Sequence, residues 1–581
     1  MLLQGELWKE WFLGIFNIYH YFRPLVYLSV FVDYLMWNLS PVGFHLSKIL
    51  LHLLASFQVF VLSALVTRRR LVALVVSALF AIMPVNVSAV AWMTARGDML
   101  VGIFCFTSLI FFILSRERKS NYLLSLAVLM YCLALLAKES ALMIPLAILV
   151  YDIVWSYRAS FNFGQLAKRF APFILVTVIY LLFRIFVLGT FGFHGAQASS
   201  SDVFNWGVGA LDNAIEPMNL GLSSRVIALL AGVVIFSVAM LRGQRILIFG
   251  LTWIPITFIP TISSIAGPTQ RSFYSPAFGI ALVLTFVLFQ IQSHSNKLIA
   301  ISGALLLIIL SISYSLATST RNQSFHRAGE ITQAIVQQVK SIAPIVRPET
   351  RMIFVGVPDR LPDGTLVFLV GFNSAIQLVY NNPTIEAFNF SEFPLWLDDP
   401  DRTLLFTIDH RKVTERQDLM LLLRKRKQCE ASENLALSWD FSTDAQGWEA
   451  WNALSEFQFR DGSLATHALA NDSSMGSPPM NIPSLVIGDV EITLAIRADQ
   501  PDVHGKLYWL GALQQDFSPD LKETFSVPAD GNFHTLRLDL AKNGKLLIQD
   551  RITQLRLDPV DVPADISLRS IRVFTHCADM K

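Results

Sequence analysis

Cationic side chains that interrupt apolar sequence are the residues of this 581-residue chain best suited to chemistry. A Lys or Arg within the apolar zone of a membrane costs roughly 2.5–3.5 kcal/mol on insertion scales, so it usually pairs with an acid or binds a ligand. The planar fork of Arg can meet two phosphate oxygens at once. One interpretation is therefore a shared, outward-facing cavity that holds a phosphate at the depth of the lipid headgroups. Its four members are Arg23, Arg96, Lys138 and Arg271.

Three carboxylates accompany these cations and are the candidates for acid–base chemistry. Asp98 and Glu139 each stand within two residues of one of the cations. Asp33 lies between apolar neighbours, and Arg23 is its expected partner. A carboxylate beside a hydroxyl can orient it or take its proton. For Asp33, a structural ion pair explains the sequence as well as a catalytic role does.

A simpler alternative exists for each cation taken singly. The side chain can extend to the membrane interface, or it can close a local ion pair such as Arg96–Asp98. Arg184 and Arg225 lie near the ends of apolar segments and are interpreted in this way. The cavity interpretation gains weight because four such groups fall at the same set of segment ends.

The composition divides the chain into two parts that differ in charge. Residues 1–317 hold 20 basic and 10 acidic side chains, whereas residues 318–581 hold 26 basic and 34 acidic ones. The whole chain is 53% hydrophobic, with a mean hydropathy of +0.49. These values exclude a wholly soluble enzyme, a disordered chain and a nucleic-acid binder with a broad basic surface. They predict a polytopic membrane domain followed by a soluble part.

A membrane-spanning helix needs about 20 apolar residues, and ten apolar stretches of the chain approach or reach that length. Twelve of the 20 basic residues fall at alternate connections between them, which the positive-inside rule assigns to the cytoplasm. The alternation places residues 318–581 outside the cytoplasm. We expect an integral membrane protein, located in the bacterial plasma membrane. The stretches are about 44–66, 71–86, 98–115, 121–137, 140–156, 170–188, 225–241, 246–265, 274–292 and 297–317.

Four parts follow from this pattern. They are an outer loop with a short interfacial helix at Pro24–Trp37 (1–43), a multi-spanning α-helical domain (44–317), a stem with a small α/β module (318–430) and an all-β sandwich (431–581). The orientation of the first span also predicts one further helix upstream of Met1.

Four sequence blocks resemble those of the GT-C membrane glycosyltransferases, in particular the protein O-mannosyltransferase-like group that includes the transmembrane-and-TPR proteins. They follow the family order over about residues 21–280. The blocks are Tyr21-Phe22-Arg23-Pro24 with Asp33-Tyr34 and Gly43-Phe44-His45-Leu46, Met83-Pro84-Val85 with Ala89-Val90-Ala91-Trp92 and Arg96-Gly97-Asp98, Leu135-Leu136-Ala137-Lys138-Glu139, and Gln270-Arg271-Ser272-Phe273-Tyr274-Ser275-Pro276.

The resemblance implies an enzyme that moves a sugar from a polyprenyl-phosphate donor to an extracytoplasmic protein or glycan acceptor. The donor lipid and the membrane lipid are its expected partners, with no nucleic acid. No cofactor is required, and a divalent metal stays open. Arg23, Arg96, Lys138 and Arg271 would bind the lipid phosphate.

This chain departs from the family pattern at two places. The family's catalytic acidic pair is expected upstream of Met1, which leaves the catalytic residues unassigned, with Asp98, Glu139 and Asp33 as the candidates within the chain. The second block has Met83, where the family has a histidine before proline. The alternative function is therefore an inactive or truncated homologue that binds a lipid-linked sugar or a glycan.

The sandwich carries a second set of candidates. Short alternating runs, among them Val490–Ile496 and Leu507–Trp509, resemble galactose-binding-like or carbohydrate-binding jelly rolls. Trp448, Trp509 and His534 are the expected carbohydrate-binding residues, with Trp451 and Tyr508 as further stacking candidates. The alternative is that these rings form the core. A Cys429–Cys577 disulfide and a Ca²⁺ site at Asp440, Asp444 and Asp558 stay open.

Overall fold

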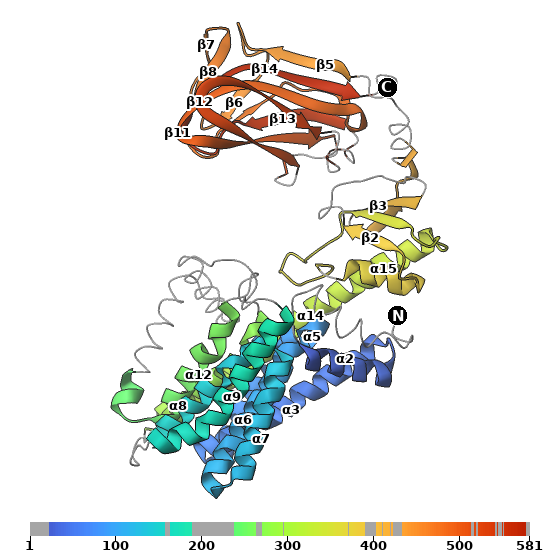
Figure 1. Ribbon diagram of the computed structural model, residues 1–581. Coiled ribbons are helices and arrows are strands. Elements are labelled where there is room, and N and C mark those ends of the chain that lie inside the picture. The colour runs from blue at the N-terminus through green and yellow to red at the C-terminus, as the bar shows by residue number, and fades with distance from the viewer. Residues whose placement is uncertain are drawn as a thin grey trace. The chain divides into compact units, whose positions relative to one another are not determined.

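The computed structural model divides into two compact units, Met1–Arg327 and Ala328–Lys581, each described here by itself (Figure 1). The residues that it describes are 23–156, 163–188, 237–262, 270–293, 296–369, 371–389, 402–409, 411–418, 420–421, 433–512, 516–518, 521–540, 543, 546, 549 and 551–576. Residues 225–236 of the seventh predicted span, and both Cys429 and Cys577, lie outside these ranges.

The first unit is helical. Its helices are α2 (Pro24–Trp37), α3 (Pro41–Thr67), α4 (Arg70–Ile82), α5 (Val87–Ala91), α6 (Arg96–Arg118), α7 (Asn121–Ala137), α8 (Ile144–Ser156), α9 (Phe163–Leu188), α12 (Arg245–Ile262), α13 (Pro276–Gln292) and the first part of α14 (Lys297–Ile342), whose residues from Ala328 onward belong to the second unit. Short 3-10 turns join some of them, namely η1 (Pro84–Asn86), η2 (Met93–Ala95), η3 (Glu139–Met143) and η5 (Gln270–Phe273).

The ends of these helices follow from local chemistry. Proline opens α2, α3 and α13, because its fixed φ suits the first helical position and its missing N–H is not needed there. Arg68 and Lys119 adopt the left-handed conformation that closes α3 and α6. Proline 84 follows α4, and the chain bends by 49° between α4 and η1–α5.

Aromatic rings from four helices form the centre of this unit. Phe106 of α6 stacks on Trp253 of α12 with ring centroids 6.2 Å apart, and it meets Phe80 of α4 and Phe278 of α13 edge-on at 5.9 and 5.7 Å. All four side chains are buried. Edge-to-face and offset geometry is the favoured arrangement of such rings. The cluster therefore fixes α4, α6, α12 and α13 against one another.

Four described helices are long and apolar enough to cross a membrane, or five if the bent pair of α4 and η1–α5 counts as one span. The four are Pro41–Thr67, Arg96–Arg118, Gly164–Phe186 and Ala300–Ile342. Shorter apolar helices lie at Pro24–Trp37, Asn121–Ala137, Arg245–Phe258 and Pro276–Gln292. The described part of the chain thus contains a membrane-type helical unit, and it does not confirm the predicted count of ten spans.

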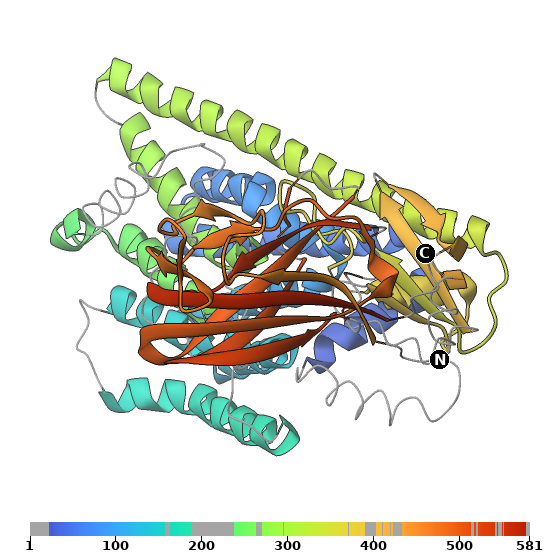
Figure 2. The ribbon, with the colours of Figure 1, turned by 90° about the horizontal axis from the view of Figure 1, so that it is seen from above.

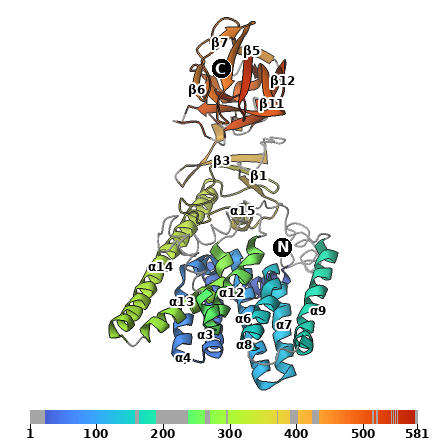
Figure 3. The ribbon, with the colours of Figure 1, turned by 90° about the vertical axis from the view of Figure 1, so that its left-hand side faces the viewer.

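The last predicted span and the predicted stem form one helix. Helix α14 is continuous over 46 residues, and its apolar first half passes into a polar second half without a break (Figure 2). Among the described helices of the first unit, α14 lies at one edge and α9 at the other (Figure 3). Only 11% of the apolar window of α14 is buried, as expected for a helix that faces lipid.

The second unit contains the predicted α/β module. Strands β1 (Arg351–Val355), β2 (Glu386–Asn389) and β3 (Thr403–Asp409) are parallel, and β4 (Lys412–Glu415) pairs antiparallel with β3, in the order β2-β1-β3-β4. Helix α15 (Phe372–Tyr380) packs Phe372 edge-on against Phe354 of β1, with centroids 4.8 Å apart.

The predicted all-β region is a sheet of ten described strands that folds back on itself. Two predicted runs, Val490–Ile496 and Leu507–Trp509, belong to one 25-residue strand, β11. Its register shifts between Ala495 and Asp502, so its first half pairs with β14 and its second half with β13. The strands are β5 (Glu433–Asp440), β6 (Glu449–Asn452), β7 (Gln458–Arg460), β8 (Ser463–Ala468), β9 (Ser474–Gly476), β10 (Ile482–Pro483), β11 (Ile487–Gly511), β12 (Lys522–Asp539), β13 (Arg551–Asp558) and β14 (Ala564–His576).

Candidate functional site

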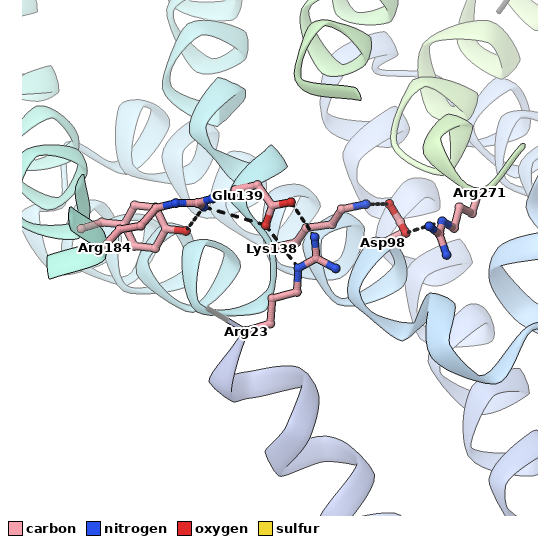
Figure 4. A network of polar contacts seen from close by, with 7 residues as sticks. Arg23, Asp98, Lys138, Glu139, Arg184 and Arg271 are labelled. Atoms are coloured by element: carbon pink, nitrogen blue, oxygen red, sulfur yellow. Dashed lines mark hydrogen bonds and ion pairs between the residues drawn. The ribbon is translucent and has the colours of Figure 1, made fainter. Parts of the chain in front are cut away.

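Asp98 is shared by two cations from different parts of the helical unit (Figure 4). Lys138 Nζ lies 2.6 Å from Asp98 Oδ1, and Arg271 Nε lies 3.9 Å from Asp98 Oδ2. The Asp98 side chain is 11% exposed, whereas that of Arg271 is 27% exposed. The guanidinium of Arg271 also stacks on the Trp92 ring, 4.2 Å from the centroid. Asp98 of α6 therefore brings together a cation from the α7–η3 junction and one from η5.

Glu139 forms a second shared node beside the first. Arg23 donates to both oxygens of Glu139, at 2.5 and 3.2 Å. Arg184 of α9 lies 4.0 Å from the same carboxylate and donates to the hydroxyl of Tyr180 at 3.3 Å. This node ties the start of α2 to α9 through η3. The two nodes are adjacent because Lys138 and Glu139 are consecutive in the chain.

The backbone conformation explains why the consecutive residues Lys138 and Glu139 contact different partners. Lys138 has φ −166° and ψ 145°, an extended conformation between α7 and η3. Successive side chains of an extended backbone point to opposite sides. Asp98 lies in the first turn of α6, where the helix dipole stabilises a negative charge.

Arg96 and Asp33 form a buried pair between α6 and α2. Arg96 Nη2 donates to Asp33 Oδ2, and Nη1 donates to the Ser29 carbonyl at 2.9 Å. The Arg96 side chain is only 1% exposed. The expected Arg23–Asp33 pair and the alternative Arg96–Asp98 pair are both wrong, because Asp33 faces α6 and Arg23 faces η3. Arg96, predicted as a phosphate ligand, is not open to a ligand in this structure.

Sequence reasoning missed two cations at this end of the unit. Lys48 of α3 is fully buried and donates to the Trp92 carbonyl at 2.8 Å. Arg184, interpreted as an interfacial side chain, is 6% exposed and belongs to the Glu139 node. The available signal was their position: each is a lone cation within an apolar segment, where an unpaired charge is costly.

A small cavity adjoins the Asp98 node. Its volume of about 20 Å³ is enough for one water molecule and far too small for a sugar. The described residues that line it are Asp98, Val101, Cys105, Ser140, Met143, Ile144, Thr257, Ser272, Tyr274 and Ser275. Its polar lining consists of one carboxylate and several hydroxyl groups.

The opposite end of α6 carries a different kind of charge cluster. Asp152 of α8 is buried and pairs with Arg116 at 2.9 Å and with Arg169 at 3.2 Å. Arg68 pairs there with Glu117 in an exposed contact. All three arginines belong to the set that the charge alternation assigns to the cytoplasm. These pairs are structural anchors and are separate from the Asp98 and Glu139 nodes.

Within the described residues, no group of three or more His, Cys, Asp or Glu side chains could hold a metal ion. The predicted calcium ligands are engaged separately. Asp440 accepts from the Ser442 amide at 3.0 Å, and Asp444 accepts from the Gln446 amide at 2.9 Å. Asp558 accepts two hydrogen bonds from its neighbour Arg556.

Two of the three predicted carbohydrate-binding residues lie in the core of the β-sheet unit. Trp509 is 0% exposed, because its side chain points to the inner face of β11. Trp448, which precedes β6, is 2% exposed and packs against Trp439 and Phe441. Neither ring can stack on a sugar in this structure, so the core alternative holds for both. His534 is partly exposed and lies 3.0 Å from Asp530, on β12 away from the other predicted residues.

The comparisons with known proteins give partial matches. No protein-family model matches the chain. It is 33% identical over 123 residues to Protein O-mannosyl-transferase Tmtc1 of Drosophila melanogaster, a match that covers 21% of this chain and 14% of the fly protein. It is 30% identical over 143 residues to Protein O-mannosyl-transferase F38B6.6 of Caenorhabditis elegans, covering 23% of this chain and 19% of the worm protein. The chain thus matches less than a fifth of either relative, which supports the family resemblance only loosely.

Among solved structures, a mutant of the family 29 carbohydrate binding module CBM29-2 is 10% identical, with a TM-score of 0.19, over 26% of this chain and 98% of that chain. The CBM22-1 xylan-binding domain of Paenibacillus barcinonensis Xyn10C is 13% identical, with a TM-score of 0.21, over 26% of this chain and 99% of that chain. TM-scores this low support no inference about a ligand.

Proposed function

We propose that the first unit is a membrane glycosyltransferase that moves a sugar from a polyprenyl-phosphate donor to an extracytoplasmic acceptor. The two partial relatives, both named protein O-mannosyl-transferases, favour the sugar-transfer class. In this proposal the end of the unit that holds Asp98 and Glu139 faces outward. The predicted ten spans, the bacterial plasma membrane and the extracytoplasmic C-terminal part complete the same topology.

The sharing of two carboxylates by four cations is the observation that carries the proposal. Arg23 and Arg184 share Glu139, and Lys138 and Arg271 share Asp98. The cations come from four separate segments and meet at one end of the unit. Their carboxylates orient them, and the planar guanidinium groups of three of them can each meet two phosphate oxygens.

Displacement at the anomeric carbon gives these groups separate roles. The bond between that carbon and the phosphate oxygen breaks, and the acceptor oxygen forms the new bond. Charge grows on the departing lipid phosphate, which Arg271 and Lys138 stabilise as preorganised cations. The acceptor hydroxyl loses its proton to a carboxylate. Asp98 lines the cavity and is the described acid placed to orient that hydroxyl, whereas Asp33 is closed off by Arg96.

The test is sugar transfer by the full-length protein in lipid nanodiscs. Radiolabelled hexose linked to a polyprenyl phosphate, mannose first, is offered with external acceptors. Arg271→Gln is expected to abolish transfer while the protein still inserts and folds. Arg68→Gln is the matched control, because Arg68 is an exposed, paired arginine at the opposite end. Transfer that survives both Arg271→Gln and Lys138→Gln would refute the assigned roles.

A second function, a non-catalytic holder that grips the phosphate of a lipid-linked sugar, is favoured by the size of the cavity. About 20 Å³ beside Asp98 has no room for a hexose, so the sugar would stay outside the cavity and only the phosphate would meet the cations. A holder would bind the donor without turning it over. Donor binding that depends on Arg271, with no transfer to any acceptor, would select this function.

A further inference from the structure

The outward face of five neighbouring strands presents one transverse row of side chains. Strands β6, β9, β13, β11 and β12 lie side by side, and the row runs through Glu449, Gly476, Arg556, Tyr508 and Lys522. Adjacent strands are about 4.8 Å apart, so the row is roughly 19 Å long. That length matches an extended polymer rather than a single small molecule.

The opposite face of the same strands is core. Leu507 and Trp509 on β11, Leu555 and Leu557 on β13, and Met475 on β9 are all buried. Side chains alternate between the two faces of a strand, so the residues between them face outward. The row therefore lies on the surface of the second unit.

At one end of the row, the exposed ring of Trp451 packs against Gly476. Trp451 is 40% exposed, and a Cβ atom at Gly476 would overlap its indole ring. The ring thus lies against the Gly476 backbone and takes the place of a side chain on β9. Phe517 adjoins it, with centroids 5.7 Å apart. Only glycine at position 476 leaves room for this arrangement.

In the middle of the row, Tyr508 lies beside the guanidinium group of Arg556, which two carboxylates fix in place. Arg556 lies over the Tyr508 ring, with its guanidinium carbon 5.1 Å from the centroid, and Lys522 Nζ lies 5.7 Å from the same centroid. Asp558 accepts from Arg556 at 2.7 and 2.9 Å, and Asp472 accepts at 3.2 Å. The geometry of this group is set before any ligand arrives, which reduces the entropy lost on binding.

The charges next to the row balance. Three cations, Arg556, Lys506 and Lys522, stand against three carboxylates, Glu449, Asp472 and Asp558. An acidic polymer would gain little from such a surface, and a nucleic acid would gain less. Aromatic faces interspersed with paired polar groups suit a ligand that has apolar C–H faces and many hydroxyl groups.

We propose that this row, with Trp451 as the stacking ring and Tyr508 held between Arg556 and Lys522, binds an uncharged, extended oligosaccharide. One pyranose face would lie on Trp451, and a neighbouring sugar would contact the outer edge of Tyr508. The sugar hydroxyl groups would hydrogen-bond with Arg556 and its carboxylate partners. The site is distinct from the expected set of Trp448, Trp509 and His534, and its two rings, Trp451 and Tyr508, are the further candidates that the sequence indicated. It does not depend on sugar transfer by the first unit.

The experiment measures oligosaccharide binding by the full-length protein in detergent. The probes are the neutral hexaoses of cellulose, xylan, mannan and maltose, an acidic oligogalacturonate, and an unrelated peptide library as the protein-docking alternative. At least one neutral hexaose is expected to bind. Trp451→Ala and Tyr508→Ala should each weaken that binding about tenfold. Phe459→Ala, an exposed ring on β7, is the matched control and should change nothing.

A further variant separates stacking from folding. Gly476→Val should displace the Trp451 ring and reduce binding as strongly as Trp451→Ala does. Arg556→Lys, which keeps the charge but loses the planar fork, should also weaken it. Failure of every neutral hexaose to bind, unchanged binding in a Trp451→Ala/Tyr508→Ala double variant, or binding of the peptides or the acidic probe alone would overturn the proposal. Variants of Lys138 or Arg271 in the first unit that lose sugar transfer should bind the oligosaccharide as the wild type does.

Discussion

The buried Arg96–Asp33 pair gives the sharpest test of which cations are structural. Asp33 is the only buried residue of helix α2, and its partner Arg96 is 1% exposed. Replacing Arg96 by Met, which has a similar length, leaves the Asp33 carboxylate buried without its cation. Replacing both residues, Arg96→Met with Asp33→Leu, removes the two charges together.

The expected magnitudes differ strongly between these variants. Breaking a buried pair by removing one partner costs about 3–5 kcal/mol, whereas replacing both by apolar groups is often neutral or stabilising. The coupling energy of the double-mutant cycle should therefore exceed roughly 3 kcal/mol. The exposed Arg68–Glu117 pair at the other end is the control, and Arg68→Met should change stability by about 0–1 kcal/mol.

The assay is unfolding of the full-length protein by SDS in mixed micelles, followed by the loss of helical circular dichroism. Arg96→Met should unfold at a clearly lower SDS fraction, and the double variant should recover most of the difference. The reasoning fails if Arg96→Met unfolds like the wild type while donor binding is lost. That result would make Arg96 a ligand-contacting residue rather than a link between α2 and α6.

Three further outcomes are expected. Trp509→Ala should destabilise the second unit by about 3–5 kcal/mol, measured by denaturant unfolding, because the ring fills its core; a near-neutral change would contradict its burial. The hydrogen bond from the Asn532 amide is the chief reason that the Asp530 pKa is lowered to about 2. The ionised carboxylate should therefore stabilise the fold above the ordinary pKa of Asp, and this stabilisation should be lost as the pH falls toward about 2. A carboxyl-carbon NMR titration of Asp530 with a midpoint near about 3.9 would refute this. Gly102→Leu should lower the midpoint of thermal unfolding, because a Cβ atom added at position 102 would lie only 2.9 Å from the Tyr274 ring. An unchanged midpoint would show that the ring can move away.

The helices were predictable where one apolar run fills one element. Pro24–Trp37 coincides with α2, and runs at 98–115 and 121–137 fall within α6 and α7. The count of spans was harder to predict, because several apolar runs form helices of only 13–17 residues. Length is what separates a span from an apolar core helix, and pattern alone does not supply it.

The site was predictable in its location but not in its pairing. Arg23, Lys138 and Arg271 meet the two carboxylates at the same end of the unit. Sequence proximity suggested Arg96–Asp98, but the first turn of α6 points the two side chains to different neighbours. Partners between 40 and 173 residues apart in the chain are set by tertiary packing, which a local pattern does not encode.

The β-sheet unit shows the same limit in a different form. Alternation located the strands, yet it did not tell which face of each strand is buried. Trp509 and Tyr508 are adjacent, and a shift of one position moves a ring from the core to the surface. Trp451 faces outward because Gly476 provides a flat seat on the neighbouring strand, a feature visible only once the strands are paired.

Binding of a polyprenyl phosphate, compared with the polyprenol of the same chain length, tests the central claim most directly. The full-length protein in nanodiscs should bind the phosphate at least about tenfold more tightly than the alcohol, since charged hydrogen bonds contribute roughly 1.5–3 kcal/mol each. Lys138→Gln and Arg271→Gln should remove most of that difference, and Arg68→Gln should keep it. Equal affinity for the phosphate and the alcohol, or a preference that survives in both variants, would contradict the account.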